Sequence, residues 1–422
     1  MKRCHLSLFP LLLCILLLSG CGNSETSSDI PSATFSLPES ADEMPSEYKP
    51  ELSPEPLPVY DLNFTISGQT LSADVTTLNL TQATPEEIDA LIKVLPALTS
   101  LQSLELGYAD AFSPLISWEQ VQELRQVAPA VALYYEVSFP GYRFSLDDDI
   151  LNLNHIRFMD DGKLAMQIAS CMPNLRIIDM DSCGVPDESM AAIRDTFPDV
   201  EVVWRVFFGD AYSTRTDADR LMISNPERGF KVLDGDAMKG LYYCTKLKYL
   251  DLGHLSSLND VGFVANMPDL EVLIIAMTAI KDLSALAECP KLNYLEVQNT
   301  AACDLSPLAG LKQLKDLNIC YNFALRDMAP IMGLDLDRLW IGSLTPISHA
   351  QIEEYQSRHP DCWVNTTTEN PTEEEWRVLE DGTAAPRYTL LYDEFQYMNF
   401  PQCYAYNEND HLYWSRFDYP VY

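Results

Sequence analysis

Residues 247–275 read LKYLDLGHLSSLNDVGFVANMPDLEVLII and contain one apolar pattern twice. In each copy an apolar residue is followed by another three positions later and by a third two positions after that. The pattern occurs five times in all, as Leu247-Leu250-Leu252, Leu270-Leu273-Ile275, Leu292-Leu295-Val297, Leu314-Leu317-Ile319 and Leu336-Leu339-Ile341. The first residues of these copies are 23, 22, 22 and 22 positions apart. A fixed period of this length predicts a solenoid, in which each repeat buries its apolar face against its neighbours.

The apolar frame and its period together are the sequence signature of leucine-rich repeats. We therefore predict an α/β solenoid, a horseshoe or arc with a parallel β-sheet on its concave side. The segments 282–286 and 304–308 leave room for a tight turn but not for a full helix. Turns of the 3₁₀ or extended type are therefore expected on the convex side of this block.

The frame continues before residue 244 in a longer and less regular form. Its copies are Val75-Leu78-Leu80, Leu101-Leu104-Leu106, Leu153-Ile156-Phe158 and Leu175-Ile178-Met180. Between them, PEEIDALIKVLPAL, SWEQVQELRQVAPAV and PDESMAAIRDTFPDV have helical periodicity and open with capping-type residues. A fourth such segment, SHAQIEEYQSRHPDC, closes the regular array near residue 362.

Composition divides the rest of the chain. We predict a signal peptide at 1–20, a disordered Ser/Pro/Glu-rich tether at 21–57, long degenerate repeats at 58–207, an irregular insert at 208–243, regular 22-residue repeats with a closing helix at 244–362, and an aromatic-rich C-terminal cap at 363–422. The insert could equally be one further divergent repeat, because its glycines only weaken the periodicity. The cap could instead be a separate ligand-binding patch.

The chain of 422 residues has a formal net charge of −34. Phosphate backbones are bound by clustered Lys and Arg, so we expect no nucleic-acid partner. The acidity fits a soluble, self-repelling surface, or one that meets a cationic partner.

The N-terminus resembles a bacterial lipoprotein signal peptide. Lys2 and Arg3 precede an apolar run at 6–18, and Leu18-Ser19-Gly20-Cys21 follows it directly. The resemblance implies lipidation of Cys21 and anchoring to the extracytoplasmic face of a bacterial membrane. No later run reaches about 18 consecutive apolar residues, so no second membrane span is expected.

Eight cysteines follow Cys21 in the sequence. They are Cys171, Cys183, Cys244, Cys289, Cys303, Cys320, Cys362 and Cys403. Cys244 and Cys289 each lie three positions before a frame leucine, where a small core residue is needed. We therefore expect mainly structural thiols, although an exported chain could also pair some of them in disulfides.

Beyond the signature itself, the regular block is similar to the internalin type, and the longer units resemble ribonuclease-inhibitor-like repeats. With its lipobox, the whole resembles leucine-rich-repeat lipoproteins of Gram-positive bacteria, and PRYTLLYDEF is similar to a tail found in that group. The resemblance covers roughly residues 58–400 and implies a fold, but no chemistry. The chain departs from the pattern at the turn position, where Leu255, Thr278, Thr300 and Asn322 replace a continuous asparagine row.

Side chains alternate along a strand, so the residues between the frame positions face the concave side. They align in two columns: Tyr249, Val272, Tyr294, Asp316, Arg338, and Asp251, Ile274, Glu296, Asn318, Trp340. We predict a binding surface made of Tyr249, Asp251, Ile274, Tyr294, Glu296, Asn318, Arg338 and Trp340. Its centre is Tyr294, Glu296, Arg338 and Trp340, because aromatic residues and arginine dominate interface energies. An ordinary solvated sheet face is the alternative.

Signs of catalysis are weak. The sequence has no G-x-S-x-G, P-loop, G-x-G-x-x-G or H-E-x-x-H motif, and its histidines are scattered. Asp179 and Asp181 point to one side of a strand, where paired carboxylates could serve acid–base chemistry or bind Ca²⁺. Solvated charge is the simpler interpretation. We expect no enzyme, cofactor or metal site.

Three functions are compatible with these features. The favoured one is a lipid-anchored module that binds an extracellular protein, peptide or glycan on its concave face. The second is an envelope scaffold without a specific ligand. The third, a surface enzyme or a solute-binding lipoprotein, requires converging carboxylates in a deep pocket.

Overall fold

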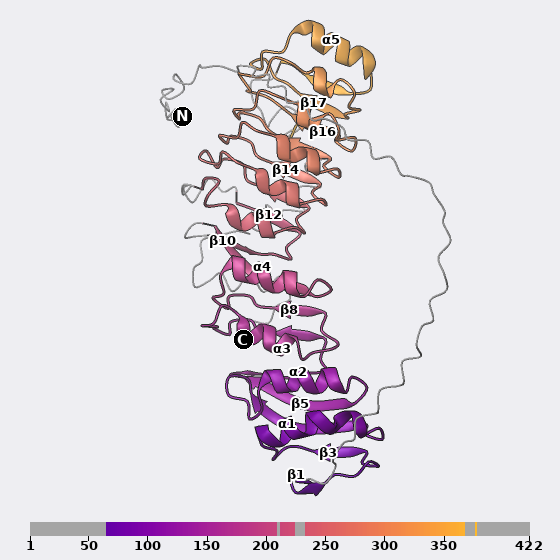
Figure 1. Ribbon diagram of the computed structural model, residues 1–422. Coiled ribbons are helices and arrows are strands. Elements are labelled where there is room, and N and C mark those ends of the chain that lie inside the picture. Colours follow the sequence, from indigo (N-terminus) through magenta and orange to yellow (C-terminus); the bar gives the residue numbers. More distant parts are fainter. Residues whose placement is uncertain (1–64, 209–211, 224–232, 368–375, 378–422) are drawn as a thin grey trace, which may run out of the picture. The chain divides into compact units, whose positions relative to one another are not determined.

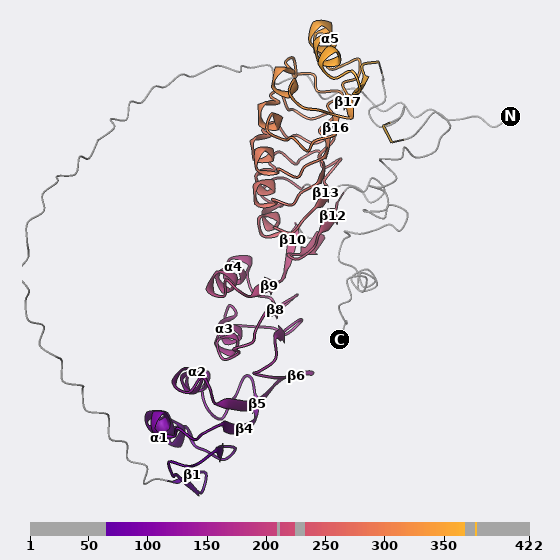
Figure 2. The ribbon, with the colours of Figure 1, turned by 90° about the vertical axis from the view of Figure 1, so that its right-hand side faces the viewer.

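The computed structural model describes residues 65–208, 212–223, 233–367 and 376–377, which belong to the unit Val59–Tyr422 (Figure 1). The signal peptide and tether expected at 1–57 lie outside the described residues, as does Cys403. Helices follow one side of the chain's path and strands the other (Figure 2).

The regular block forms a seven-stranded parallel sheet in chain order. Its strands are β12 (Arg220–Met222), β13 (Tyr249–Asp251), β14 (Val272–Ile274), β15 (Tyr294–Glu296), β16 (Asp316–Asn318), β17 (Arg338–Trp340) and β18 (Trp363–Asn365). Both columns expected from the sequence are in register from β13 to β17. The predicted fold, a leucine-rich-repeat solenoid with a parallel sheet, is confirmed.

Short 3₁₀ turns lie opposite this sheet. They are η3 (Lys239–Tyr243), η4 (Gly262–Asn266), η5 (Ser284–Glu288), η6 (Ser306–Leu308) and η7 (Ala329–Ile331), and α5 (His349–Arg358) closes the series. The middle frame residues Leu250, Leu273, Leu295, Leu317 and Leu339 have no exposed surface. The brevity of the connecting segments therefore predicts the convex turns correctly.

The longer repeats carry full helices. In chain order the elements are β1 (Thr65–Ile66), β2 (Gln69–Thr70), β3 (Thr77–Asn79), α1 (Pro85–Val94), η1 (Leu95–Ala97), β4 (Ser103–Asp110), α2 (Trp118–Val127), β5 (Ala132–Phe139), β6 (Tyr142–Ser145), β7 (Ile150–Asn152), α3 (Lys163–Ala169), β8 (Ile177–Asp179), α4 (Asp187–Thr196) and β9 (Glu201–Val203). Thr84 with Glu87 and Ser117 with Gln120 form capping boxes, so the polar residues that open these segments fix where α1 and α2 begin.

The expected insert at 208–243 contains a strand of the regular sheet. A hairpin of β10 (Arg205–Phe208) and β11 (Tyr212–Arg215) comes first, and β12 then pairs in parallel with β13. Leu221 lies opposite Leu250, so Ala218 occupies the place of the first frame leucine. This small residue hides the repeat in the sequence. Of the two alternatives for 208–243, the pairing of β12 fits one further divergent repeat rather than an irregular insert.

Threonine holds two of the turns at which asparagine is missing. Thr278 Oγ1 donates to the carbonyl of Ile275 at 2.7 Å, and Thr300 Oγ1 donates to that of Val297 at 3.0 Å. Asn322 Nδ2 also donates to Val297, at 3.0 Å. Threonine hydroxyls thus satisfy turn carbonyls that the missing asparagines would otherwise bind.

The buried cysteines of the described residues behave as core thiols. Cys171, Cys183, Cys244, Cys289 and Cys320 are buried and form no disulfide. Burial raises the pKa of Cys171 and of Cys183 to about 12, so both remain protonated and unreactive at neutral pH.

Asp179 and Asp181 are buried rather than solvated, each with 6% of its surface exposed. Arg205 donates to the two carboxylate oxygens of Asp181 at 2.8 and 2.5 Å, and Arg215 binds Asp179 at 3.0 and 3.1 Å. Burial alone would raise the pKa of Asp181, but Arg205 holds it below its usual value. The pair therefore fastens the β10–β11 hairpin to β8, a contact that strand alternation alone cannot reveal.

Arg215→Ala is expected to destabilise the fold, because it leaves Asp179 buried without its guanidinium. Removing one partner of a buried ion pair costs about 3–5 kcal/mol. Urea unfolding followed by circular dichroism measures this loss. Arg176→Ala is the matched control, since Arg176 and Asp149 form an exposed pair whose loss matters much less. Equal losses for the two variants would contradict a structural role of the buried pair.

Candidate binding site on the concave sheet

The side chains predicted to face the concave side do gather there. A second apolar cluster, separate from the main core, consists of Met222, Val272, Ile274, Ala276, Tyr294, Cys320, Trp340 and Trp376, with Tyr249, Tyr321 and Trp363 packed against it. The parallel register brings these residues together, since each strand contributes the same positions.

This face is covered, whereas the sequence suggests an open surface. Tyr294, Glu296 and Trp340 have no exposed surface. Trp376, equally buried, packs against them, and Arg377 beside it binds Glu296. We call Tyr294, Glu296, Gln298, Arg338 and Trp340 the concave pocket. The cover was missed because residues 376–377 follow the last repeat and lack its frame.

Glu296 is the polar centre of the concave pocket. Its Oε1 accepts from the indole Nε1 of Trp376 at 2.8 Å and from the Nε of Arg377 at 3.1 Å. Its Oε2 accepts from Gln298 Nε2 at 3.0 Å and from the Nη2 of Arg377. The hydroxyl of Tyr294 donates to Oε1. The Glu296 carboxylate therefore accepts hydrogen bonds from the indole of Trp376 and from the guanidinium of the next residue, Arg377.

Arg338 binds Trp376 from the other side. Its Nη1 donates to the main-chain carbonyl of Trp376 at 3.1 Å, and its guanidinium carbon lies 4.3 Å from the ring centroid. Its Nε donates to Asp316 at 2.5 Å, which fixes the side chain. The indole also lies 5.5 Å from the ring of Tyr294 and 5.4 Å from that of Trp340. Trp376 is thus held by aromatic, cation–π and hydrogen-bond contacts together.

The charges in this cluster are settled by burial and by Arg377. Burial alone would raise the pKa of Glu296, but the charge and hydrogen bonds of Arg377 bring it below the usual value. Burial and the Glu296 carboxylate raise the pKa of Tyr294 well above its usual value. At neutral pH the pocket therefore holds a carboxylate, a neutral phenol donor and a guanidinium.

Trp340 and Gln298 each have an unsatisfied polar atom in the pocket. Trp340 Nε1 and Gln298 Oε1 are buried and have no hydrogen-bond partner among the described residues. Each such group costs about 1–3 kcal/mol when left unpaired. A bound molecule that supplied an acceptor to the indole or a donor to the amide would recover this energy.

The remaining predicted site residues have local structural contacts. Asp251 accepts from the backbone N–H of Gly253 at 2.9 Å, and Asn318 accepts from that of Cys320 at 3.1 Å, so both hold the strand ends. The guanidinium of Arg220 lies 5.6 Å from the ring centroid of Tyr249. Ile274 is buried in the concave cluster.

Two exposed tyrosines lie on neighbouring strands of the longer repeats. Tyr108 on β4 and Tyr134 on β5 are 56% and 53% exposed. The register between β4 and β5 shifts between Glu105 and Gly107, where Gly107 has a φ of +75°. Such a bulge reverses the alternation and turns Tyr108 outward. Tyr108, Tyr134, Glu105 and Glu136 form what we call the tyrosine face, which the frame alone does not predict.

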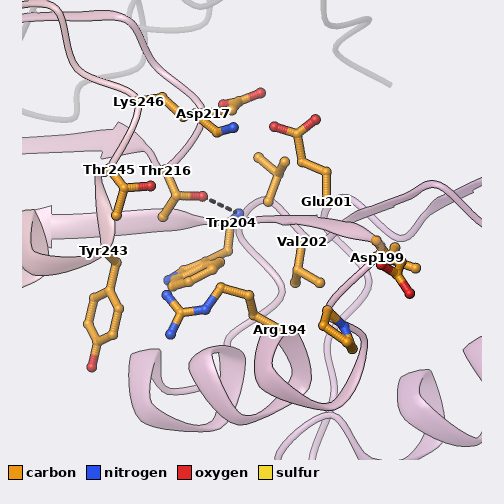
Figure 3. A pocket seen from close by; sticks show the side chains of 13 residues that line it. Arg194, Asp199, Glu201, Val202, Trp204, Thr216, Asp217, Tyr243, Thr245 and Lys246 are labelled. Atoms are coloured by element: carbon orange, nitrogen blue, oxygen red, sulfur yellow. Dashed lines mark hydrogen bonds between the residues drawn. The ribbon is translucent and has the colours of Figure 1, made fainter. Parts of the chain in front are cut away.

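Figure 3 shows a pocket of about 350 Å³ beside α4 and β9. The indole of Trp204 forms part of its lining, and its Nε1 already donates to Asp187 at 3.0 Å. The polar lining mixes both charges, with Arg194 and Lys246 beside acidic residues. The lining side chains do not point to one class of ligand. We therefore interpret this pocket as a gap where the longer repeats meet the regular block. No cluster of three or more potential metal ligands occurs within the described residues.

No protein-family model and no curated protein matches the chain. Among solved structures it is similar to an internalin (InlF) of Listeria monocytogenes, at 18% identity over 65% of this chain and 76% of that one, with a TM-score of 0.31. A leucine-rich-repeat protein of Leptospira interrogans gives 17% identity, coverage of 69% and 81%, and a TM-score of 0.31. The ectodomain of the plant receptor kinase GASSHO1/SCHENGEN3 of Arabidopsis thaliana is 14% identical over 71% of this chain and 33% of that one, with a TM-score of 0.26.

Glu296→Gln tests the charge of the concave pocket. Because the folded chain lowers the pKa of Glu296, its ionisation contributes stability that is present above the ordinary pKa and is lost as pH falls through the lowered one. The unaltered chain should therefore lose more free energy of unfolding on acidification than Glu296→Gln does. Urea titrations at a series of pH values measure the difference. Burial also lowers the pKa of the neighbouring His254, so two chains are compared rather than one curve read alone.

The control for this measurement is Glu288→Gln, at an exposed position in η5. It should follow the unaltered chain at every pH. Parallel curves for the unaltered chain and Glu296→Gln would show that folding does not lower the pKa of Glu296.

Proposed function

We propose that this chain is a lipid-anchored binding module on the outer face of a bacterial membrane, and that its concave sheet recognises a protein or peptide ligand. One observation carries the proposal: the concave pocket holds an aromatic and a guanidinium side chain, Trp376 and Arg377, through a buried carboxylate. Aromatic residues gathered with arginine, here Tyr294, Trp340 and Arg338, have the composition of an interface centre rather than of a surface that merely spaces or shields.

The contacts favour a peptide over a glycan at this pocket. Arg338 binds a main-chain carbonyl, and Glu296 binds an indole and a guanidinium, all of which are groups that peptides present. Trp340 Nε1 could donate to a main-chain carbonyl of the ligand, and Gln298 Oε1 could accept from a ligand amide, since neither atom has a partner among the described residues. A ligand with these groups could replace every contact that Trp376 and Arg377 make.

A glycan remains a second candidate, at the tyrosine face. Its exposed rings can stack on sugars, and Glu105 and Glu136 beside them can accept hydroxyl hydrogen bonds. This surface is open without any rearrangement, which distinguishes it from the concave pocket.

The membrane anchor rests on the sequence of residues 1–21. Within the described residues, no helix combines the length and apolar character that a span requires. We propose the lipobox-like Leu18-Ser19-Gly20-Cys21 as the attachment point, because it follows a positively charged start and an apolar run.

Cys21→Ser is expected to release the protein from the membrane fraction, because it removes the thiol to which the lipid would be attached. Fractionation of cells and metabolic labelling with a fatty-acid analogue measure this. Cys183→Ser, which alters a buried core thiol, should leave both labelling and membrane association intact. Unchanged labelling of Cys21→Ser would exclude this anchor.

Ligand recognition is tested by selecting displayed random peptides on the purified chain and by screening the same chain on a glycan array. We expect selected peptides to contain aromatic and basic residues, and Glu296→Gln to weaken their binding at least about tenfold, the size of one charged hydrogen bond. Glu288→Gln should bind as the unaltered chain does.

The alternatives give different results. Glycan binding that is lost in Tyr108→Ala with Tyr134→Ala, but kept in Glu296→Gln, would move the function to the tyrosine face. Absence of any selected peptide or glycan would favour the scaffold and overturn the proposal.

A further inference from the structure

The concave pocket is incomplete without residues that follow the repeats. Between β13 and β17 the two columns contribute three carboxylates, Asp251, Glu296 and Asp316, but a single guanidinium, that of Arg338. Arg338 is already bonded to Asp316. The positive charge at Glu296 comes from Arg377, 81 positions further along the chain. The sheet therefore provides the acidic half of an ion pair, and a later segment provides the other half.

We infer that the concave pocket is specific for an aromatic residue followed by arginine, and that Trp376–Arg377 is a tethered copy of this ligand. The inference rests on the proposed function and deepens it. An incoming ligand must displace the chain's own dipeptide, so the module is closed until a better competitor arrives. The pocket is then both a recognition site and its own regulator.

The contacts read a dipeptide rather than a generic apolar plug. Glu296 binds the indole N–H and the guanidinium, while Arg338 binds the carbonyl that joins the two residues. An indole at the first position is bounded by Tyr294 and Trp340 at 5.5 and 5.4 Å. Lysine cannot make the paired contact of Nε and Nη2 with both oxygens of Glu296, so arginine is preferred at the second position.

The tethered copy leaves hydrogen-bonding capacity unused in the pocket. Trp340 Nε1 and Gln298 Oε1 lie inside the pocket without a partner among the described residues. A contact that served stability alone would satisfy such buried groups. A competitor that reaches them gains over Trp376–Arg377 at the same site, which gives displacement a physical source.

Displacement is also compatible with the energetics of a buried ion pair. Desolvation offsets much of the attraction between two buried charges, so a closed pair can exchange for a similar one at small net cost. The tether supplies an effective concentration on the order of millimolar, which an external ligand must overcome. Emptying the pocket should therefore increase its apparent affinity for an added peptide.

The experiment adds the chain's own segment in trans. The probe is a fluorescein-labelled synthetic peptide PTEEEWRVLEDG, residues 371–382, and the readout is fluorescence anisotropy. The full chain carrying Trp376→Ala with Arg377→Ala should bind this peptide at least about tenfold more tightly than the unaltered chain, because its pocket is empty. Adding Glu296→Gln to the double variant should abolish that gain. A peptide with both Trp and Arg changed to Ala should bind neither chain.

A second variant guards against loss of folding. Arg377→Gln keeps the indole and removes only the charge, so it should bind the added peptide with intermediate affinity while its circular dichroism remains that of the unaltered chain. A folded double variant that does not bind the peptide, or an unaltered chain that binds it equally well, would overturn the inference.

The two proposals fail separately. Selected external peptides that depend on Glu296 while PTEEEWRVLEDG does not bind would leave the proposed function and remove the tethered ligand. Binding of PTEEEWRVLEDG to the emptied pocket with no external ligand selected would support the tethered contact and count against the function.

Discussion

Stacking of the middle frame leucines is the constraint on which the regular block depends. A single repeat exposes half of its leucine, and only a neighbour with the same spacing can cover it. Leu250, Leu273, Leu295, Leu317 and Leu339 are wholly buried because a period near 22 residues places each beside the next. This stacking also sets the register of the residues between the leucines, so the concave columns follow from the core.

The concave columns include a buried carboxylate, that of Glu296, whose cation comes from outside the sheet. The register gathers Tyr294, Glu296 and Trp340 into one pocket, but a buried carboxylate there requires a cation. Within the sheet Arg338 pairs with Asp316, and Arg377 provides the positive charge beside Glu296. The geometry that stabilises the solenoid thus buries a carboxylate that needs a cation. An arginine side chain can provide this cation, whether it belongs to this chain or to another.

The sequence predicts much of this arrangement, and its failures have physical causes. The frame predicts the strands, their register and the membership of the concave cluster, because periodicity is local information. It cannot predict that Trp376 and Arg377 cover that cluster, since a contact across 80 positions leaves no periodic trace. Ala218 hides β12, and the shift at Gly107 turns Tyr108 outward against simple alternation. The binding role of the predicted residues remains a prediction.

The division of the strands into separate sheets affects how the chain bears mechanical load. The main sheets contain four, three and seven strands, and the β10–β11 hairpin lies between the last two in the sequence. Repeats within one sheet support each other through their ladders, whereas the junctions lack this coupling. A pull between an anchor at Cys21 and a ligand on β15 would pass through every junction. The ion pairs of Arg205 with Asp181 and of Arg215 with Asp179 then stabilise the junction before the seven-stranded sheet against such a load.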